Sequence, residues 1–287
     1  MNPTLVCILV FLLMTAMILI GIPLSISMLS CALLGFTIVS GFDLAVTQFT
    51  NSLFTLSHSY NFAVIPLFMV VGTLASVSGM AEGTFTAAKK WLGRVRGGLL
   101  HSVVLANMIF GACSGMSSAG NIVFSKIALP ELRKSGYDET LSIGTITCAG
   151  SLSVLIPPSV PIISFSLLAG VSIGKALVCG ISTGIVFALL MMLMIVIIGA
   201  VKPSLIPARE TTKVPMREKI GTLKLLLPII ALFALIVGGS FAGWFPATVG
   251  GAVAVVAILI YCIARRLPVK EIFAGIMEGT SSFANVY

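Results

Sequence analysis

Apolar segments long enough to cross a lipid bilayer follow one another along almost all of this 287-residue chain. A bilayer core of about 30 Å takes roughly 20 apolar residues per helix, and backbone groups inside it must bond within their own segment. Composition agrees, because 58% of the residues are hydrophobic and only 9% are charged. We therefore predict an all-α polytopic membrane protein. The expected segments are 4–21, 24–41, 61–78, 98–129, 141–171, 176–201, 225–242 and 246–264.

The net charge of +8 is expected to set the orientation in the membrane, and no nucleic-acid partner is expected. Segment 98–129 has basic flanks on both sides: Lys89, Lys90, Arg94 and Arg96 precede it, and Arg133 and Lys134 follow it. Cytoplasmic loops carry an excess of Lys and Arg, so both ends of this segment are expected on the cytoplasmic side. A segment with both ends on one side is a re-entrant hairpin. Its tip is expected within "FGACSGMSSAGN", residues 110–121, where glycines allow bending and serines supply hydroxyls.

The other connections extend this topology. Linker 202–224 has the strongest cytoplasmic signal, with Lys202, Arg209, Lys213, Arg217, Lys219 and Lys224. Counting spans back from it places the amino terminus on the periplasmic side. The connection 41–61 has no Lys or Arg, and its apolar residues recur at near-helical spacing. It is either a helix lying along the membrane surface or a plain loop.

Segment 141–171 contains a cluster of prolines, Pro157, Pro158 and Pro161. Proline lacks an N–H and clashes with the preceding turn, so the helix is expected to stop near Leu155 and restart near Val160. Interrupted helices persist in a membrane where they are buried in protein or line a hydrated site. Paired half-helices offer carbonyl oxygens to a cation at their carboxyl ends and amides to an anion at their amino ends.

Hydroxyl groups accompany both breaks. Ser114, Ser117 and Ser118 lie at the hairpin tip, and Thr147, Ser151 and Ser159 lie around the prolines. Hydroxyl and carbonyl oxygens without a carboxylate suit a monovalent cation such as sodium better than a divalent or transition metal. The alternative is that these serines only cap helices and mediate packing. No nucleophile–base pair or metal motif accompanies them, so neither an enzyme nor a cofactor is expected.

Four motifs resemble the large membrane subunit of tripartite ATP-independent periplasmic (TRAP) transporters, the dicarboxylate permease DctM type. They are "IPLFMVVGTLA" (65–75), "GGLLHSVVLANMIFGACSG" (97–115), "LPELRKSGYD" (129–138) and "IPPSVPIISFSLLAGVSIGKAL" (156–177). The resemblance implies an elevator-type transporter of the bacterial inner membrane, built from inverted repeats that each contain a re-entrant hairpin and a broken helix. It implies sodium as the coupling ion and a carboxylate substrate, such as a C4-dicarboxylate. It also implies two partners, a periplasmic substrate-binding protein and a small four-helix membrane subunit.

Carried onto this sequence, the resemblance implies one sodium site between the tip and the break. Its residues would be Ser114, Gly115, Ser117, Ser118, Ser151, Ile156, Pro157 and Ser159. The family often has Gly-Ser-x-x-Ala-Asp at the tip, whereas this chain has "GMSSAGN" (115–121). The alternatives are a sodium-coupled carboxylate carrier that works without a binding protein and a structural membrane subunit that does not transport.

The resemblance also predicts a division of the chain. Residues 1–96 would form scaffold helices and a surface arm, and 97–201 half of the transport domain, with the hairpin at 97–134 and the broken helix at 141–171. Residues 202–224 would form a cytoplasmic linker, and 225–287 the start of an inverted second repeat. An inverted-repeat transporter needs a second hairpin and a second broken helix, so we expect this sequence to be a partial one.

Overall fold

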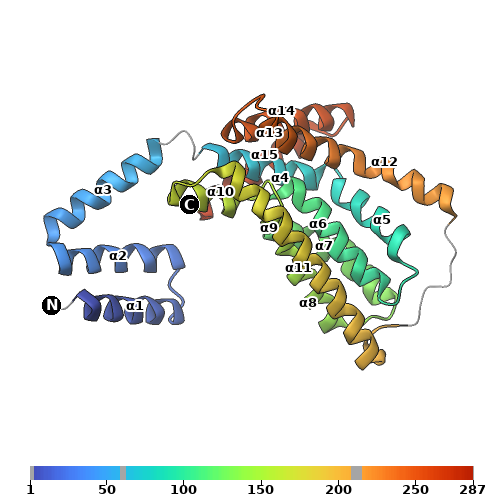
Figure 1. The fold of residues 1–287 in the computed structure, drawn as a ribbon, viewed down its shortest axis with the longest axis horizontal. Coiled ribbons are helices and arrows are strands. Elements are labelled where there is room, and N and C mark those ends of the chain that lie inside the picture. Colours follow the sequence, from blue (N-terminus) through green and yellow to red (C-terminus); the bar gives the residue numbers. More distant parts are fainter. Residues whose placement is uncertain (1–2, 59–62, 208–214, 287) are drawn as a thin grey trace. The chain divides into compact units, whose positions relative to one another are not determined.

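A computed structural model describes residues 3–58, 63–207 and 215–286, and every element in these ranges is a helix (Figure 1). The predicted all-α fold is therefore confirmed. The chain divides into two compact units, Met1–Tyr60 and Asn61–Tyr287. Each unit is described by itself.

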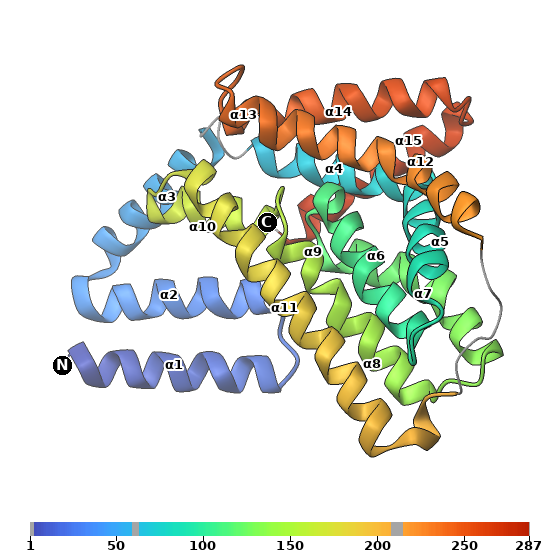
Figure 2. The same cartoon turned by 45° about the vertical axis from the view of Figure 1, so that its right-hand side comes forward.

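The first unit contains α1 (Pro3–Leu19), α2 (Leu24–Ser40) and α3 (Phe42–His58). Helices α1 and α2 lie side by side, joined by a short turn (Figures 1 and 2). Gly41, with φ 92°, provides the left-handed backbone that redirects the chain into α3. The connection 41–61 is thus a helix over most of its length, and its residues 59–61 lie outside the described part.

The second unit begins with α4 (Val64–Val77) and α5 (Met80–Leu92), which meet at a bend of 61°. Gly79 supplies the positive φ of 78° between them. The apolar segments expected from the sequence leave 80–92 unassigned, and α5 is a correction to that expectation. Helix α5 has one apolar face and carries Glu82, Lys89 and Lys90, so a search for uninterrupted apolar runs misses it.

Helices α6 (Gly98–Ser114) and α7 (Ser117–Lys134) form the expected hairpin. The rings of Phe110 and Phe124 pack edge to face with centroids 5.8 Å apart, which places residues on either side of the turn against each other. The turn lies at Gly115, with φ 62°. This confirms that the chain reverses its direction within the tip predicted from the sequence.

The expected broken helix consists of α8 (Glu139–Gly150), α9 (Leu152–Leu155) and α10 (Val160–Ala169). The axis bends by 45° between the parts before and after the prolines. The helix ends at Leu155 and restarts at Val160, as predicted from Pro157, Pro158 and Pro161.

The remaining elements are one long helix, α11, and the helices that follow it in the chain. Helix α11 (Ile173–Val201) ends in a 3₁₀ turn, η2 (Pro203–Leu205). The later elements are α12 (Met216–Phe233), the π-helical segment η3 (Ala234–Gly238), α13 (Gly239–Phe241), α14 (Ala247–Ala264) and α15 (Val269–Val286). Helix α12 begins inside the expected linker 202–224, which corrects that boundary, because its charged first turns belong to the helix and not to the connection.

Two helices of the described chain, Ile173–Val201 and Met216–Phe241, are long and apolar enough to cross a membrane unaided. The two bent pairs, α4 with α5 and α8–α9 with α10, raise this number to four if each pair forms one span. Four further apolar helical stretches of the described residues are shorter: Thr4–Leu19, Leu24–Ser40, Gly98–Ser114 and Thr248–Ala264.

The basic flanks predicted from the sequence lie together at one end of the second unit. Lys89, at the end of α5, pairs with Glu131, at the end of α7. Lys90 pairs with Glu218 of α12 at 3.3 Å, and the Asp138 amide before α8 donates to the Leu205 carbonyl after α11 at 3.1 Å. The ends of five helices therefore meet there. That this end faces the cytoplasm stays a prediction.

Candidate ion site at the two helix breaks

The hairpin tip and the proline break touch through their backbones. The Val160 N–H, one of the orphan donors at the start of α10, donates to the Gly115 carbonyl at 3.2 Å. A Cβ atom at Gly115 would lie 2.4 Å from the Pro158 carbonyl oxygen, closer than any side chain tolerates. Glycine at 115 thus permits both the left-handed turn and the close approach of the break.

The prolines leave backbone oxygens without their usual helical donors. In an α-helix the carbonyls of Ser153 and Val154 would accept from residues 157 and 158, which are prolines and have no N–H. The Ser159 hydroxyl donates to the Val154 carbonyl and also accepts from the Ile162 N–H at 3.3 Å. Ser159 thus caps both half-helices, and the Ser153 carbonyl is left without a helical donor.

Two hydroxyl groups, one at the tip and one in the short helix before the break, are buried and lack a hydrogen-bond partner among the described residues. Ser114 ends α6 and Ser153 lies in α9, and both side chains are 0% exposed. Leaving a buried polar group unpaired costs about 1–3 kcal/mol, and such groups in a native fold commonly mark a bound ion or water.

Glycines on the neighbouring helices let the backbones approach this region. A Cβ at Gly72 of α4 would lie 2.6 Å from the Ser114 carbonyl oxygen, and one at Gly111 of α6 would lie 2.7 Å from Ser153 Cα. On the other side, a Cβ at Gly180 of α11 would lie 2.4 Å from the Leu155 carbonyl oxygen. The tip and the break are therefore held between α4 and α11.

The structure brings some of the residues predicted from the sequence together and separates others. Ser114, Gly115, Ile156, Pro157 and Ser159 are buried where the tip meets the break. Ser117, in the first turn of α7, is half-buried.

Ser118 and Ser151 are exposed, so they lie outside the buried contact. Thr147, one turn before Ser151, is exposed as well. Sequence reasoning missed Ser153, although its position four residues before Pro157 is a signal that its carbonyl loses its donor.

The groups at the contact are neutral oxygens. No cluster of three or more His, Cys, Asp or Glu side chains that could hold a metal occurs among the described residues. Carbonyl and hydroxyl oxygens without carboxylates favour a hard monovalent cation over Ca²⁺, Mg²⁺ or a transition metal. The carboxyl end of α9 adds the negative end of a helix dipole, although this helix has only 4 residues.

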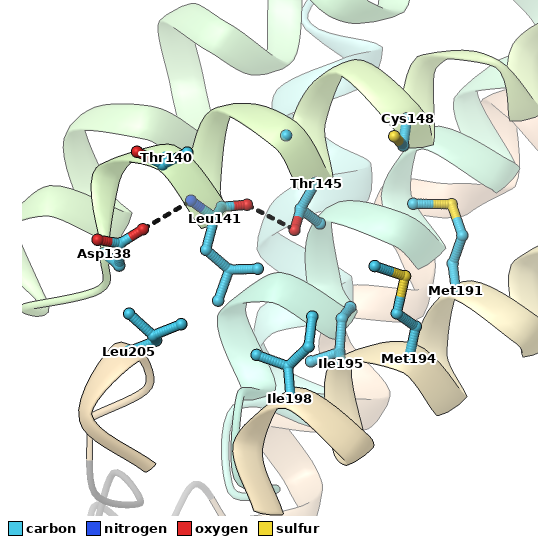
Figure 3. A pocket seen from close by; sticks show the side chains of 11 residues that line it. Asp138, Thr140, Leu141, Thr145, Cys148, Met191, Met194, Ile195, Ile198 and Leu205 are labelled. Carbon is cyan, nitrogen blue, oxygen red and sulfur yellow. Dashed lines mark hydrogen bonds between the residues drawn. The ribbon is translucent and has the colours of Figure 1, made fainter. Parts of the chain in front are cut away.

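An apolar cavity of about 330 Å³ lies elsewhere, between α8 and α11 (Figure 3). Two of its polar side chains bond to the helix that carries them: Asp138 accepts from the Leu141 N–H at 2.8 Å, and the Thr145 hydroxyl donates to the Leu141 carbonyl at 2.8 Å. Met191, Met194 and Ile198 form much of the opposite wall. This cavity contains one carboxylate, and that group already caps α8, whereas the tip–break contact gathers buried oxygens without such a role; the candidate site is therefore the tip–break contact.

Comparison with known proteins gives a match over nearly the whole chain. The family model described as "Tripartite ATP-independent periplasmic transporter, DctM component" matches residues 11–287.

Several curated proteins are similar to the chain. The C4-dicarboxylate TRAP transporter large permease protein DctM of Pseudomonas aeruginosa is 32% identical over 212 residues, covering 74% of this chain and 49% of that protein. The protein of the same name from Vibrio cholerae is 30% identical, covering 86% of this chain and 54% of that protein. The ectoine TRAP transporter large permease protein TeaC of Halomonas elongata is 24% identical, covering 91% and 61%. The chain thus spans about half the length of the curated relatives it matches.

Proposed function

The chain belongs to the DctM family of TRAP transporter large permeases, and on that premise we propose that it imports a carboxylate-bearing solute together with sodium. The proposed setting is the bacterial inner membrane, with the basic end of the second unit facing the cytoplasm. In this role the chain binds and moves its substrate and does not alter it chemically.

The observation that carries the sodium proposal is the contact between tip and break. Gly115 and Val160 hold the two interrupted segments together, and the buried Ser114 hydroxyl next to them has no hydrogen-bond partner among the described residues. A sodium ion bound there would satisfy this hydroxyl and the Ser153 carbonyl. Because the ligands come from two segments, the ion would stabilise their docking, and sodium binding would be coupled to the conformation of the tip.

The substrate class rests on the relatives. Two of them are named for C4-dicarboxylates, and a protein from Escherichia coli that is 28% identical is named for 2,3-diketo-L-gulonate, which is also a carboxylate. We therefore assign a carboxylate-bearing solute and leave the carbon skeleton open. The proposed partners are a periplasmic substrate-binding protein, which delivers the solute, and a small four-helix membrane subunit.

Uptake into proteoliposomes tests this function. The complete permease, with its small subunit and binding protein, is compared with and without an inward sodium gradient at constant ionic strength. We expect uptake of a C4-dicarboxylate to require sodium. The Ser114→Ala/Ser159→Ala variant should need a higher sodium concentration for half-maximal uptake. The matched control is Ser118→Ala/Ser151→Ala, which removes two exposed hydroxyls and should behave as the unmodified protein does.

Three results would count against the proposal in different ways. An uptake rate that is the same with and without the sodium gradient would show that transport is not coupled to sodium. Sodium-dependent uptake that both double variants change equally would move the ion away from the tip–break contact. Uptake that persists without the binding protein would instead identify a carrier that works alone.

A further inference from the structure

A second group of unpaired oxygens lies deeper in the hairpin than the tip. It consists of Asn107 Oδ1 of α6, Asn121 Oδ1 of α7 and Ser153 Oγ of α9, here called the α6–α7–α9 oxygen cluster. Each of these atoms is buried and has no hydrogen-bond partner among the described residues. Asn107 and Ser153 are 0% exposed as whole residues.

Two glycines make room for these oxygens, Gly120 for those of Asn107 and Ser153 and Gly150 for that of Asn121. A Cβ at Gly120 of α7 would lie 2.7 Å from Asn107 Oδ1, 3.1 Å from Ser153 Oγ and 3.8 Å from Gly150 Cα. A Cβ at Gly150 of α8 would lie 2.0 Å from Asn121 Oδ1. The absence of side chains at 120 and 150 is therefore what leaves room for the amide oxygens.

The orientation of Asn107 directs its oxygen into the cluster. Its amide nitrogen donates to the Val103 carbonyl one turn back on α6 at 3.1 Å, so the amide oxygen points away from that carbonyl. An amide oxygen only accepts hydrogen bonds, and a second acceptor, Asn121 Oδ1, lies against Gly150, whose Cα would be 3.8 Å from a Cβ at Gly120. Two buried acceptors without donors cost free energy unless a cation or a water molecule joins them.

We propose that the α6–α7–α9 oxygen cluster is a second site for a monovalent cation, with sodium as the ion that fits its chemistry. The atoms that would bind the ion are neutral oxygens, with no carboxylate, imidazole or thiolate among them. This set favours sodium over a divalent or transition metal. The cluster differs in its ligands from the tip–break site. Only Ser153 is shared, since its hydroxyl faces the cluster and its carbonyl belongs to the proline break.

This arrangement links the two sites through one residue. An ion in the cluster fixes the Ser153 side chain, and an ion at the break uses the carbonyl of the same residue. Occupation of the cluster thus pre-orders α9 for the second ion, and binding at the two sites is expected to be cooperative.

Equilibrium binding of radioactive ²²Na⁺ to the purified 287-residue chain in detergent tests the proposal, with choline chloride holding the ionic strength constant. The chain is compared with Asn107→Ala, which removes one ligand, and Gly120→Ala, which pushes a methyl group into the cluster and keeps every ligand. Asn51→Ala, an exposed asparagine of α3, is the matched control. Ser114→Ala/Ser159→Ala removes the unpaired hydroxyl at the tip and the cap of the proline break, and it reports on the tip–break site.

We expect two classes of sodium sites in the unmodified chain and in Asn51→Ala. Asn107→Ala and Gly120→Ala should each weaken the cluster class by about tenfold or more, the effect of losing roughly 1.4 kcal/mol, and through the shared Ser153 they should weaken the tip–break class by a smaller factor. Ser114→Ala/Ser159→Ala should weaken mainly the tip–break class. If the double variant binds sodium as the unmodified chain does, while the cluster variants bind it more weakly, the result would count against the tip–break site and support the cluster.

A single class of sites in the unmodified chain, removed by the Ser114→Ala/Ser159→Ala change, would overturn the proposal without any cluster variant having to fold. The same holds if Asn107→Ala and Gly120→Ala remain monodisperse and helical and bind sodium as the unmodified chain does. The cluster would then hold only water.

Discussion

Gly72 of α4 is the residue on which the hairpin tip rests. A Cβ there would lie 2.6 Å from the carbonyl oxygen of Ser114 and 3.0 Å from its Cα, so the obstruction is backbone and cannot rotate away. Any side chain at 72 must therefore displace either α4 or the tip. Because Ser114 ends α6 directly before the turn at Gly115, such a displacement acts on the proposed ion site without removing a ligand.

We predict that Gly72→Ala lowers the free energy of unfolding by about 1–3 kcal/mol, the usual cost of overpacking, and weakens the protection that sodium gives against heat. Thermal unfolding in sodium chloride and in choline chloride measures both effects. Gly144→Ala is the control, because a Cβ at Gly144 in α8 meets no atom within 4 Å. Equal melting curves for the two variants would contradict this account of Gly72.

The sequence identifies some of these residues and not others, for a physical reason. Ser114, Gly115 and Ser159 can be identified from the sequence because they lie inside the helix breaks that glycine and proline predict. Gly72 and Asn107 lie in regular helices, and what makes them important is the contact with a segment far away in the sequence. A single sequence, read without the structure, contains no pattern that indicates such a contact.

At the scale of elements, the broken helix depends on the prolines that follow α9. Pro157 denies the Ser153 carbonyl its helical donor, which makes that oxygen available to a cation. An ordinary residue at 157 would provide an N–H that competes with the ion for the same oxygen.

We therefore predict that Pro157→Ala raises the sodium concentration needed for half-maximal uptake while the protein stays as stable as before or becomes more so. Pro130→Ala is a demanding control, because Pro130 also interrupts helical bonding, in α7, but is exposed and far along the helix from the tip. A change in sodium dependence of equal size in both variants would show that helix stiffness, and not the Ser153 carbonyl, is responsible.

The elements themselves could be predicted where hydrophobic pattern and helix breakers agree. The hairpin of α6 and α7 and the interruption between Leu155 and Val160 follow from charge flanks, glycine and proline. Helix α5 and the first turns of α12 could not be predicted in this way. Both segments carry charges on one face, so neither forms an uninterrupted apolar run in the sequence. Their apolar faces are recognised only from the fold, in which α5 and α12 pack together at Gly83 and Leu225.

At the scale of the whole molecule, α11 sets the distance between the two ends of the second unit. Its 29 residues span about 43 Å at 1.5 Å per residue, enough to cross a bilayer core. Its carboxyl end lies with the basic group of helix ends, and its amino end follows the turn at Gly170 and Ser172. The charge distribution predicts which end is cytoplasmic.

Thiol labelling of intact cells checks this orientation. In a chain whose 6 native cysteines are replaced, Ser172→Cys should react with a membrane-impermeant reagent added from outside, and Ser204→Cys should react only after the membrane is opened. Both serines are exposed, so accessibility within the protein does not separate them. The reverse labelling pattern would invert the proposed topology.

Sodium bound between the hairpin tip and the proline break would be visible by electron cryomicroscopy of the complete permease, compared in sodium and in choline. We predict a density peak in sodium that is bounded by the Ser114 hydroxyl and the Ser153 carbonyl, and its loss in choline together with loosening of the contact between Gly115 and Val160. Identical maps at this contact in the two salts, with the Ser114 hydroxyl bonded only to protein, would contradict sodium binding there.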